Sequence, residues 1–182
     1  MDHLEEARAL IDRLPKAKTA VSFSGGKDSL VVLHLASVAG IRRAVFSDTT
    51  IESQKTVDYV KEVSYRLGVE IEIARPRRSF FELLPLLGPP STKSRWCCPT
   101  IKYQQLNEYA RKNGIRVFLT GLRRDESSRR KKYRQIDRNP MLPYLVEANP
   151  ILDWSEEDVW AYIKDNGLPV PPGYPEHPRN GC

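Results

Sequence analysis

The fold is decided by the stretch Val21-Ser22-Phe23-Ser24-Gly25-Gly26-Lys27-Asp28-Ser29-Leu30-Val31-Val32-Leu33. Upstream of the two glycines, Thr19 to Phe23 is rich in β-forming residues. Downstream of them, Ser29 to Ala39 carries leucine, valine and alanine at helical spacing. The pattern predicts a short buried strand, a tight glycine turn and then an apolar helix.

This turn has the features of a phosphate-binding site. Glycines accept positive φ and carry no side chains, so backbone N–H groups can converge on an anion. The helix that follows adds unsatisfied N–H groups and the positive end of its dipole. Lys27 contributes a mobile positive charge, and Asp28 and Ser29 can cap the helix or reach a metal-bound phosphate. We therefore expect a nucleotide's phosphates to be bound by Ser24, Gly25, Gly26, Lys27, Asp28 and Ser29.

Length and composition place the chain in a broad class. Its 182 residues suit one domain spanning residues 1–182, with a core large enough to need no disulfides. The beginning lacks the basic and apolar regions of a signal peptide, and no apolar run approaches the ~20 residues of a membrane span. Three cysteines do not make a disulfide framework. We expect a cytoplasmic protein without membrane spans, and the abrupt end at Cys182 suggests a truncated C-terminus.

Strand and helix patterns alternate along the chain, which predicts an α/β fold. The expected strands are Thr19–Phe23, Arg43–Phe46, Val69–Ala74 and Arg116–Leu119. The expected helices are Leu4–Leu14, Ser29–Ala39, a helix capped by Thr49 and Glu52 that runs to Leu67, Pro99–Lys112 and Glu156–Asp165. This alternation indicates an open parallel sheet with right-handed crossovers and helices on both faces. Two stretches lack the regularity: Arg75 to Ser94, and the strongly basic Gly121 to Arg138, which we expect to be a loop.

Polar residues follow the second and fourth expected strands, at the edge where the phosphate turn lies. In open α/β sheets ligands bind at the carboxyl ends of the strands, so Asp48 and Thr49 could face a nucleotide or its metal. Thr49 could equally be a helix cap, and the two interpretations are compatible. After the fourth strand come Gly121, Arg123 and Arg124. Because arginine forks bind phosphate and sulfate bidentately, we expect the two arginines to bind an anionic substrate.

The rest of this basic segment is open to other interpretations. A solvated basic surface is the more common role of a charge run, and we expect that role for Lys131 and Lys132. Nucleic-acid binding is an alternative, since Tyr133 lies among the basic residues. A single tyrosine makes that alternative weak.

Two adjacent cysteines are candidate metal ligands. Cys97 and Cys98 open a helix, where the dipole would lower the thiol pKa and favour the thiolate that binds metals. Lys102 lies one helical turn on, and Cys182 is the third thiol. An iron–sulfur cluster normally takes four cysteine ligands, so two buried cysteines and an unrelated third remain the alternative. His34 lies within an apolar helix and is expected to be a packed core residue.

Separate segments resemble one branch of the PP-loop ATP pyrophosphatase superfamily, the phosphoadenylyl-sulfate (PAPS) and adenylyl-sulfate (APS) reductases. The first is the Ser-Gly-Gly-Lys-Asp-Ser turn. The others are Asp48-Thr49 with Glu52-Ser53, Cys97-Cys98 with Lys102, and Thr120 to Ser127, which reads Thr-Gly-Leu-Arg-Arg-Asp-Glu-Ser. Segments between Asn149 and Cys182 follow the family's closing pattern in order, so the similarity spans residues from about 20 to 182.

The resemblance implies an adenine nucleotide α-hydrolase-like fold with sheet order 3-2-1-4-5 and a sulfonucleotide site over the phosphate turn. It implies that Cys97, Cys98 and Cys182 are ligands of a [4Fe-4S] cluster, whose fourth ligand would follow Cys182 and is not in the sequence. Family members also carry a catalytic cysteine on a C-terminal tail, which is not in the sequence either. A thioredoxin-like electron donor and a homo-oligomer are further expectations.

Two enzymatic functions remain open. In a PAPS or APS reductase, Lys27, Arg123 and Arg124 would bind the sulfate and phosphates as catalytic groups. Asp48 would orient the nucleotide, and the product would be sulfite. Reductases, however, usually have a degenerate phosphate turn, whereas this intact one resembles enzymes that cleave ATP to AMP and pyrophosphate. In such an adenylyl transferase Lys27 would stabilise the leaving pyrophosphate, and Asp28 or Asp48 would place Mg²⁺. A nucleic-acid-binding protein is the third and least favoured hypothesis.

Overall fold

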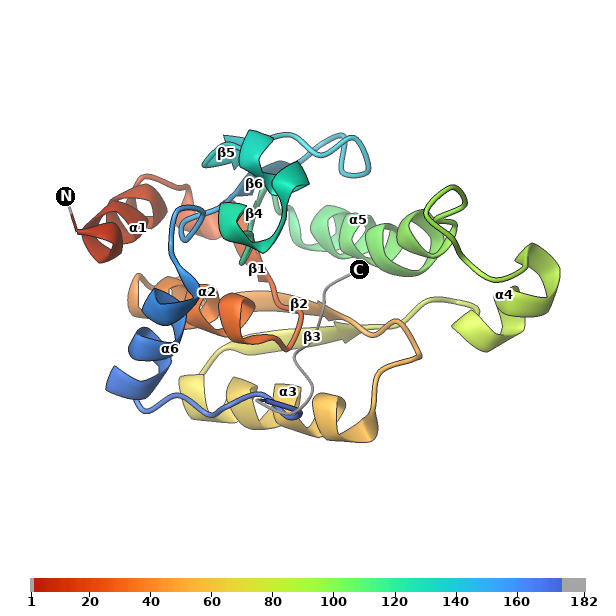
Figure 1. Ribbon diagram of the computed structural model, residues 1–182, viewed down its shortest axis with the longest axis horizontal. Coiled ribbons are helices and arrows are strands. Elements are labelled where there is room, and N and C mark those ends of the chain that lie inside the picture. Colours follow the sequence, from red (N-terminus) through yellow and green to blue (C-terminus); the bar gives the residue numbers. More distant parts are fainter. Residues whose placement is uncertain (1, 175–182) are drawn as a thin grey trace.

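The computed structural model describes residues 2–174, which form one six-stranded sheet with helices on both faces (Figure 1). The strand order is β3-β2-β1-β4-β6-β5. The strands are β1 (Thr19–Ser22), β2 (Arg43–Ser47), β3 (Glu70–Ala74), β4 (Val117–Leu119), β5 (Ile136–Asp137) and β6 (Val146–Ala148). All neighbouring pairs from β3 to β6 are parallel, and β5 pairs antiparallel with β6.

This order confirms the predicted parallel sheet 3-2-1-4-5, with β6 as the fifth parallel strand. The expectation of a loop over residues 121–138 is wrong. That segment contains two short 3₁₀ helices, Arg124–Glu126 and Ser128–Lys132, and the edge strand β5. Because β5 has only two residues, it leaves no alternating pattern in the sequence by which it could be predicted.

The helices follow the predicted alternation, except that one further helix lies within residues 75–94, where no regular structure is predicted. The α-helices are α1 (His3–Asp12), α2 (Lys27–Val38), α3 (Gln54–Leu67), α4 (Phe80–Leu87), α5 (Gln104–Asn113) and α6 (Glu156–Asp165). A π-helix, Cys98–Tyr103, leads directly into α5. Helix α6 begins with a capping box, in which Ser155 and Asp158 are bonded reciprocally.

The predicted cap of α3 is wrong. Ser53 is the N-cap, and its hydroxyl accepts a hydrogen bond from the backbone N–H of Thr56. The helix cannot begin at Thr49, because Thr50 has a φ of 65°, in the left-handed region. Asp48 favours that turn, since its carboxylate accepts the Thr50 N–H at 2.9 Å.

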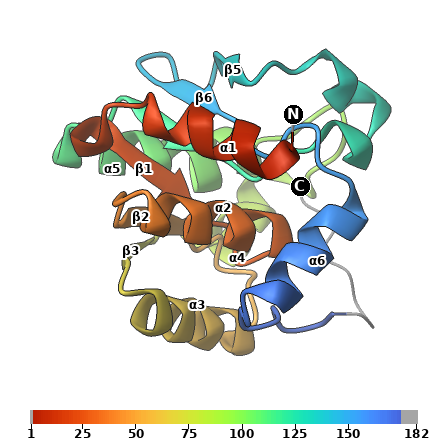
Figure 2. The ribbon, with the colours of Figure 1, turned by 90° about the vertical axis from the view of Figure 1, so that its left-hand side faces the viewer.

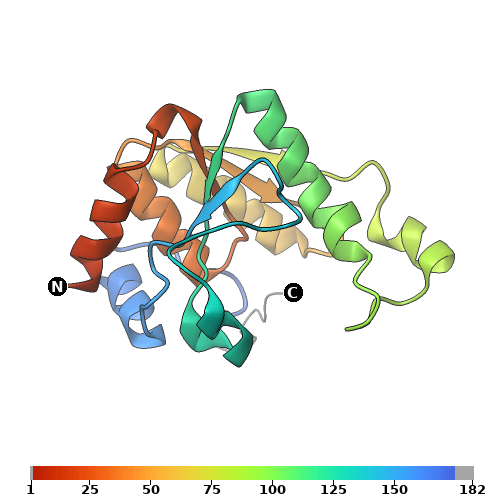
Figure 3. The same cartoon turned by 90° about the horizontal axis from the view of Figure 1, so that it is seen from above.

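Alternating residues of the central strands face two separate cores. Val21 and Leu119 face the larger core, which α1, α2, α3 and α6 cover; Figure 2 shows α1, α2 and α6 in front of the sheet. Ala20 and Phe118 point the other way, into a smaller core against α5. Figure 3 shows α5 (green) across the sheet from α1 (red). The prediction of helices on both faces is therefore confirmed.

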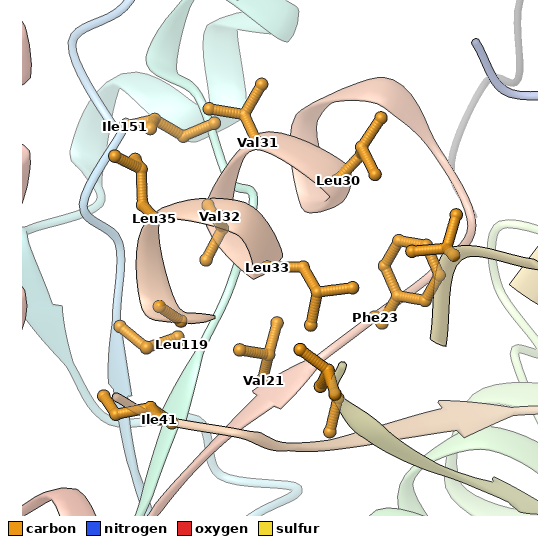
Figure 4. Packing of buried hydrophobic residues seen from close by; sticks show 14 of the residues in the cluster. Val21, Phe23, Leu30, Val31, Val32, Leu33, Leu35, Ile41, Leu119 and Ile151 are labelled. Carbon is orange, nitrogen blue, oxygen red and sulfur yellow. The ribbon is translucent and has the colours of Figure 1, made fainter. Parts of the chain in front are cut away.

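Helix α2 lies at the centre of the larger core. Leu30, Val31, Val32 and Leu33 are all fully buried, on every side of the helix. Figure 4 shows these side chains between α2 and residues of neighbouring elements, including Val21 and Leu119. This packing fixes the position of the helix that follows the glycine turn, and therefore fixes the turn.

Residues 75–94 were expected to be irregular, but they contain α4, with a capping box between Ser79 and Glu82. None of the helix residues is buried, although most are apolar. Leu86 is 66% exposed, and Phe80 stacks on Trp96 with ring centroids 5.4 Å apart. Figure 1 shows α4 extending away from the sheet. Within residues 2–174 no helix is both long and apolar enough to cross a membrane.

Candidate phosphate-binding site

The turn between β1 and α2 has an anion-binding shape. Gly25 has a φ of 73°, a conformation that side-chain-bearing residues rarely adopt. Gly26 is the N-cap of α2 and offers no side chain to the helix, so the first N–H groups of α2 have no side-chain cap. Such groups favour an anion, and the helix dipole adds to the effect.

Ser29 braces this turn from inside. Its hydroxyl donates to the carbonyl of Gly26 at 3.0 Å and accepts the N–H of Ser24 at 3.2 Å. The Oγ atoms of Ser24 and Ser29 are also 3.0 Å apart. Ser29 is 4% exposed, so it holds the shape of the turn from the helix side. The second serine of the motif therefore has a structural role that its position alone did not reveal.

Gly121 brings a second loop against the same turn. A Cβ atom at this position would lie 2.6 Å from the backbone N of Ser29 and 2.7 Å from the carbonyl carbon of Asp28. Only glycine allows this approach of two backbones. The loop after β4 is therefore in contact with the first turn of α2.

Beside this contact, one carboxylate joins two cations. Asp28 accepts from Arg123 Nε at 2.6 Å through Oδ1 and from Lys27 Nζ at 3.0 Å through Oδ2. Arg123 is 3% exposed and Lys27 5%. Arg123 also donates to the backbone oxygen of Trp154 at 3.3 Å. The structure thus brings together three of the predicted residues, with the Asp28 carboxylate between two buried cations.

Glu156 joins this cluster, a contact that no sequence pattern indicates. Its Oε1 lies 3.7 Å from Lys27 Nζ, and its side chain is 55% exposed. Glu156 is the first residue of α6, which packs beside α2 (Figure 2). The sequence predicts that a helix begins at Glu156, but only the tertiary packing places that helix start beside Lys27.

Asp48 and Thr49 lie at the same edge of the sheet, after β2. Asp48 is 6% exposed, and its Oδ2 accepts from Arg75 Nε at 2.9 Å. Its Oδ1 accepts the N–H of Thr50. Thr49 donates to Glu52 Oε1 at 3.4 Å. Asp48 is therefore held by a cation from the end of β3, an interaction that the sequence did not indicate.

Arg124 turns away from Arg123. It pairs with Asp153 and donates to the carbonyl oxygen of Tyr133 at 3.0 Å. The two arginines therefore do not contact the same carboxylate, and the catalytic role of Arg124 stays a prediction. Lys131 and Lys132 are exposed, as expected for a solvated surface.

Cys97 and Cys98 are both half-buried, at the start of the π-helix. The expectation of a lowered pKa is wrong for Cys98: burial first, and then the neighbouring Cys97, raise the pKa of its thiol. Lys102 and Arg95 act in the opposite direction, with smaller effects. Within residues 2–174 no group of three or more His, Cys, Asp or Glu side chains could hold a metal ion. The third predicted ligand, Cys182, lies outside the described residues.

His34 is half-buried and packs as predicted, with Nδ1 2.9 Å from the hydroxyl of Tyr162. Burial lowers its pKa, and Arg8 adds to the effect. The side chain therefore serves the contact between α2 and α6.

Comparison with known proteins places this geometry in a family. The model of the phosphoadenosine phosphosulfate reductase domain matches residues 18–180. An uncharacterized protein of Methanocaldococcus jannaschii is 34% identical over 148 residues, which are 81% of this chain and 36% of the relative. The adenosine 5'-phosphosulfate reductase 2 of Bacillus subtilis is 28% identical over 170 residues, 91% of this chain and 71% of that enzyme. The chain thus spans about a third of the first relative's length.

Solved structures show the same fold. The phosphoadenylyl-sulfate reductase of Candida auris superposes with a TM-score of 0.71 at 21% identity, covering 94% of this chain and 82% of that one. Yeast FAD synthetase in complex with FAD also gives 0.71, at 14% identity, covering 93% and 60%. The fold is therefore adenine nucleotide α-hydrolase-like. Because the family model covers most of the sequence, the chain belongs to the phosphoadenosine phosphosulfate reductase domain family of the PP-loop superfamily.

Proposed function

We propose that this chain binds an adenine sulfonucleotide over the turn between β1 and α2 and reduces its sulfate to sulfite. The observation that carries the proposal is the convergence of Lys27 and Arg123 on the first turn of α2. Two cations and a helix N-terminus would suit adjacent phosphate and sulfate groups. Relatives that the chain covers over two thirds or more of their length include APS reductases, which supports APS as the substrate.

Other residues would have supporting roles in this reaction. Lys27 and Arg123 would stabilise negative charge on the phosphosulfate, and Arg124 would act at the outer side of the site. Asp48 would orient the nucleotide from the end of β2. Cys97 and Cys98 would supply two ligands of an iron–sulfur cluster. A dithiol protein of the thioredoxin type would supply the two electrons that sulfate reduction needs.

A second function has one observation in its favour. The turn is an intact Ser-Gly-Gly-Lys-Asp-Ser sequence, a form suited to holding pyrophosphate. In an ATP-dependent adenylyl transfer, Lys27 and the amides of α2 would stabilise the leaving pyrophosphate. The product would then be pyrophosphate, with no sulfite.

A product assay separates the two functions. The protein, purified without oxygen, is offered APS, PAPS and ATP in turn with a dithiol reductant, and sulfite, AMP and pyrophosphate are quantified. The proposal predicts sulfite and AMP from APS, lost in Lys27→Ala and retained in Lys132→Ala, which removes an exposed lysine. Pyrophosphate from ATP without any sulfite would support adenylyl transfer and contradict reduction.

A further inference from the structure

The two carboxylates at this site, Asp28 and Asp48, accept hydrogen bonds through all four of their oxygens. Asp28 Oδ1 accepts from Arg123 Nε at 2.6 Å and Oδ2 from Lys27 Nζ at 3.0 Å. Asp48 Oδ1 accepts the N–H of Thr50 and Oδ2 the Nε of Arg75, each at 2.9 Å. All four oxygens thus have N–H donors. Magnesium in nucleotide sites is held by one or two carboxylates together with the phosphates, and here each candidate carboxylate already pairs with a cationic side chain.

The charges around Asp28 also favour an anion over a cation. Lys27 and Arg123 are 5% and 3% exposed, and both pair with the Asp28 carboxylate that lies between them. A divalent cation at Asp28 would displace one of these buried cations and leave it unpaired, which is costly in a buried position. It would also be repelled by the other cation. A phosphate or sulfate group would instead meet two buried cations, while solvent screens the more exposed carboxylates of Glu156 and Asp125.

Other acidic groups near these cations do not complete a metal site. Glu156 lies 3.7 Å from Lys27, and Asp125 lies 3.7 Å from Arg123, with exposed fractions of 55% and 69%. Lys27 therefore already lies beside the Glu156 carboxylate, and Arg123 beside the Asp125 carboxylate. Over residues 2–174 no three acidic, cysteine or histidine side chains form a metal-binding group.

We infer that the site binds its anionic ligand without a divalent cation, and that Asp28 is a positioning residue that aligns Lys27 and Arg123 for that ligand. The inference rests on the proposed sulfonucleotide site and deepens it. It implies that the substrate is a phosphosulfate anion that binds without a metal ion, and APS is the first candidate. It also implies that Asp28, the aspartate of the intact Ser-Gly-Gly-Lys-Asp-Ser turn, pairs with Arg123 and does not bind magnesium.

Equilibrium binding with and without magnesium tests the inference. The dissociation constants of APS, ATP and inorganic pyrophosphate are measured by calorimetry in excess Mg²⁺ and in EDTA, without reductant. We expect the dissociation constant of APS to change by less than about twofold, whereas a site built on a metal ion loses about tenfold or more without it. ATP should bind more weakly in Mg²⁺, because the metal neutralises phosphates that Lys27 and Arg123 would contact.

The variant Asp28→Asn separates positioning from metal binding. It should weaken APS binding about tenfold, the scale of a lost charge-assisted pair, and by the same factor in Mg²⁺ and in EDTA. In an Arg123→Lys background its effect should be smaller, because the contact between Asp28 and Arg123 is already weakened while the contact with Lys27 remains. Asp125→Asn is the matched control: it removes one exposed carboxylate beside the same arginine and should leave affinity within about twofold.

Two results would overturn the inference. One is tighter binding of APS or ATP in Mg²⁺ by about tenfold or more, abolished by Asp28→Asn. The other is the absence of binding of all three anions in both buffers. The wild-type metal comparison stands by itself if Asp28→Asn does not fold, as shown by its thermal unfolding. A protein that binds APS without metal but forms no sulfite would contradict the proposed function and leave this inference standing.

Discussion

Gly121 holds the loop after β4 against the first turn of α2, where a Cβ would lie 2.6 Å from the Ser29 nitrogen. We expect Gly121→Ala to separate the two loops and move Arg123 away from Asp28. Overpacking of this kind costs about 1–3 kcal/mol. Calorimetry should therefore show weaker APS binding as well as a lower unfolding temperature.

Gly40→Ala is the control for that variant. Gly40 has a φ of 88° and open space around its would-be Cβ, so alanine there is strained without colliding with anything. This variant should lose stability and keep its affinity for APS. Equal loss of APS affinity in the two variants would show that Gly121 acts only through overall stability.

Cys98 carries a prediction about pH. Because burial and Cys97 raise the pKa of its thiol, its thiolate should form only at pH values above the ordinary range for cysteine. Alkylation of Cys98 by iodoacetamide, followed by mass spectrometry in the metal-free protein, should therefore accelerate late in a pH series. Cys97→Ala removes the second cause and should shift the profile to lower pH. If Cys97→Ala leaves the pH profile of Cys98 alkylation unchanged, the result would contradict the role of Cys97 in raising the pKa of Cys98.

Among the elements, α2 and α4 are opposite cases of apolar helices. Leu33 of α2 is fully buried, whereas Leu86 of α4 is 66% exposed. Leu33→Ala should cost about 2–5 kcal/mol of unfolding free energy, because it leaves a cavity in the larger core. Leu86→Ala should stay within about 0.5 kcal/mol. Denaturant unfolding of both variants measures the contrast, and a similar cost for both would mean that α4 is packed against the rest of the protein.

The same two elements show how far the sequence predicts the fold. For α2, a β-rich strand, two glycines and a run of leucine and valine all indicate the same structure, and the structure agrees. For α4, Pro85 and the prolines after it hide an eight-residue helix whose apolar side chains face no core. The capping box at Ser79 and Glu82 is the sequence signal that marks the start of this helix.

At the scale of the whole molecule, parallel topology brings distant residues to one edge of the sheet. Strand order alone predicted that Asp48, Gly121 and Arg123 would follow strands beside the glycine turn. It could not predict the pairs Arg75–Asp48 and Glu156–Lys27. Those pairs depend on how α6 packs on α2 and on the path of the chain after β3, which single-residue patterns do not encode.

The charge of the whole molecule gives a prediction about salt. The chain has a net charge of +6, and basic residues are frequent in the segments that follow β3 and β4 at this edge. The affinity for anionic APS should therefore fall as ionic strength rises, because screening weakens the attraction between partly exposed charges. Adenosine, which is uncharged, is the matched control ligand, and its affinity should change little. An APS affinity that does not change with salt would contradict a cationic site.

The measurement that tests the central claim most directly is the affinity for APS of three proteins: the wild type, Lys27→Ala and Lys132→Ala. Lys27 is buried beside Asp28 and the helix start, and Lys132 is exposed on the basic segment. The account predicts that Lys27→Ala weakens binding about tenfold or more, the scale of a charge-assisted contact, while Lys132→Ala has no such effect. Equal affinities in all three proteins would show that the anion does not bind at the turn between β1 and α2.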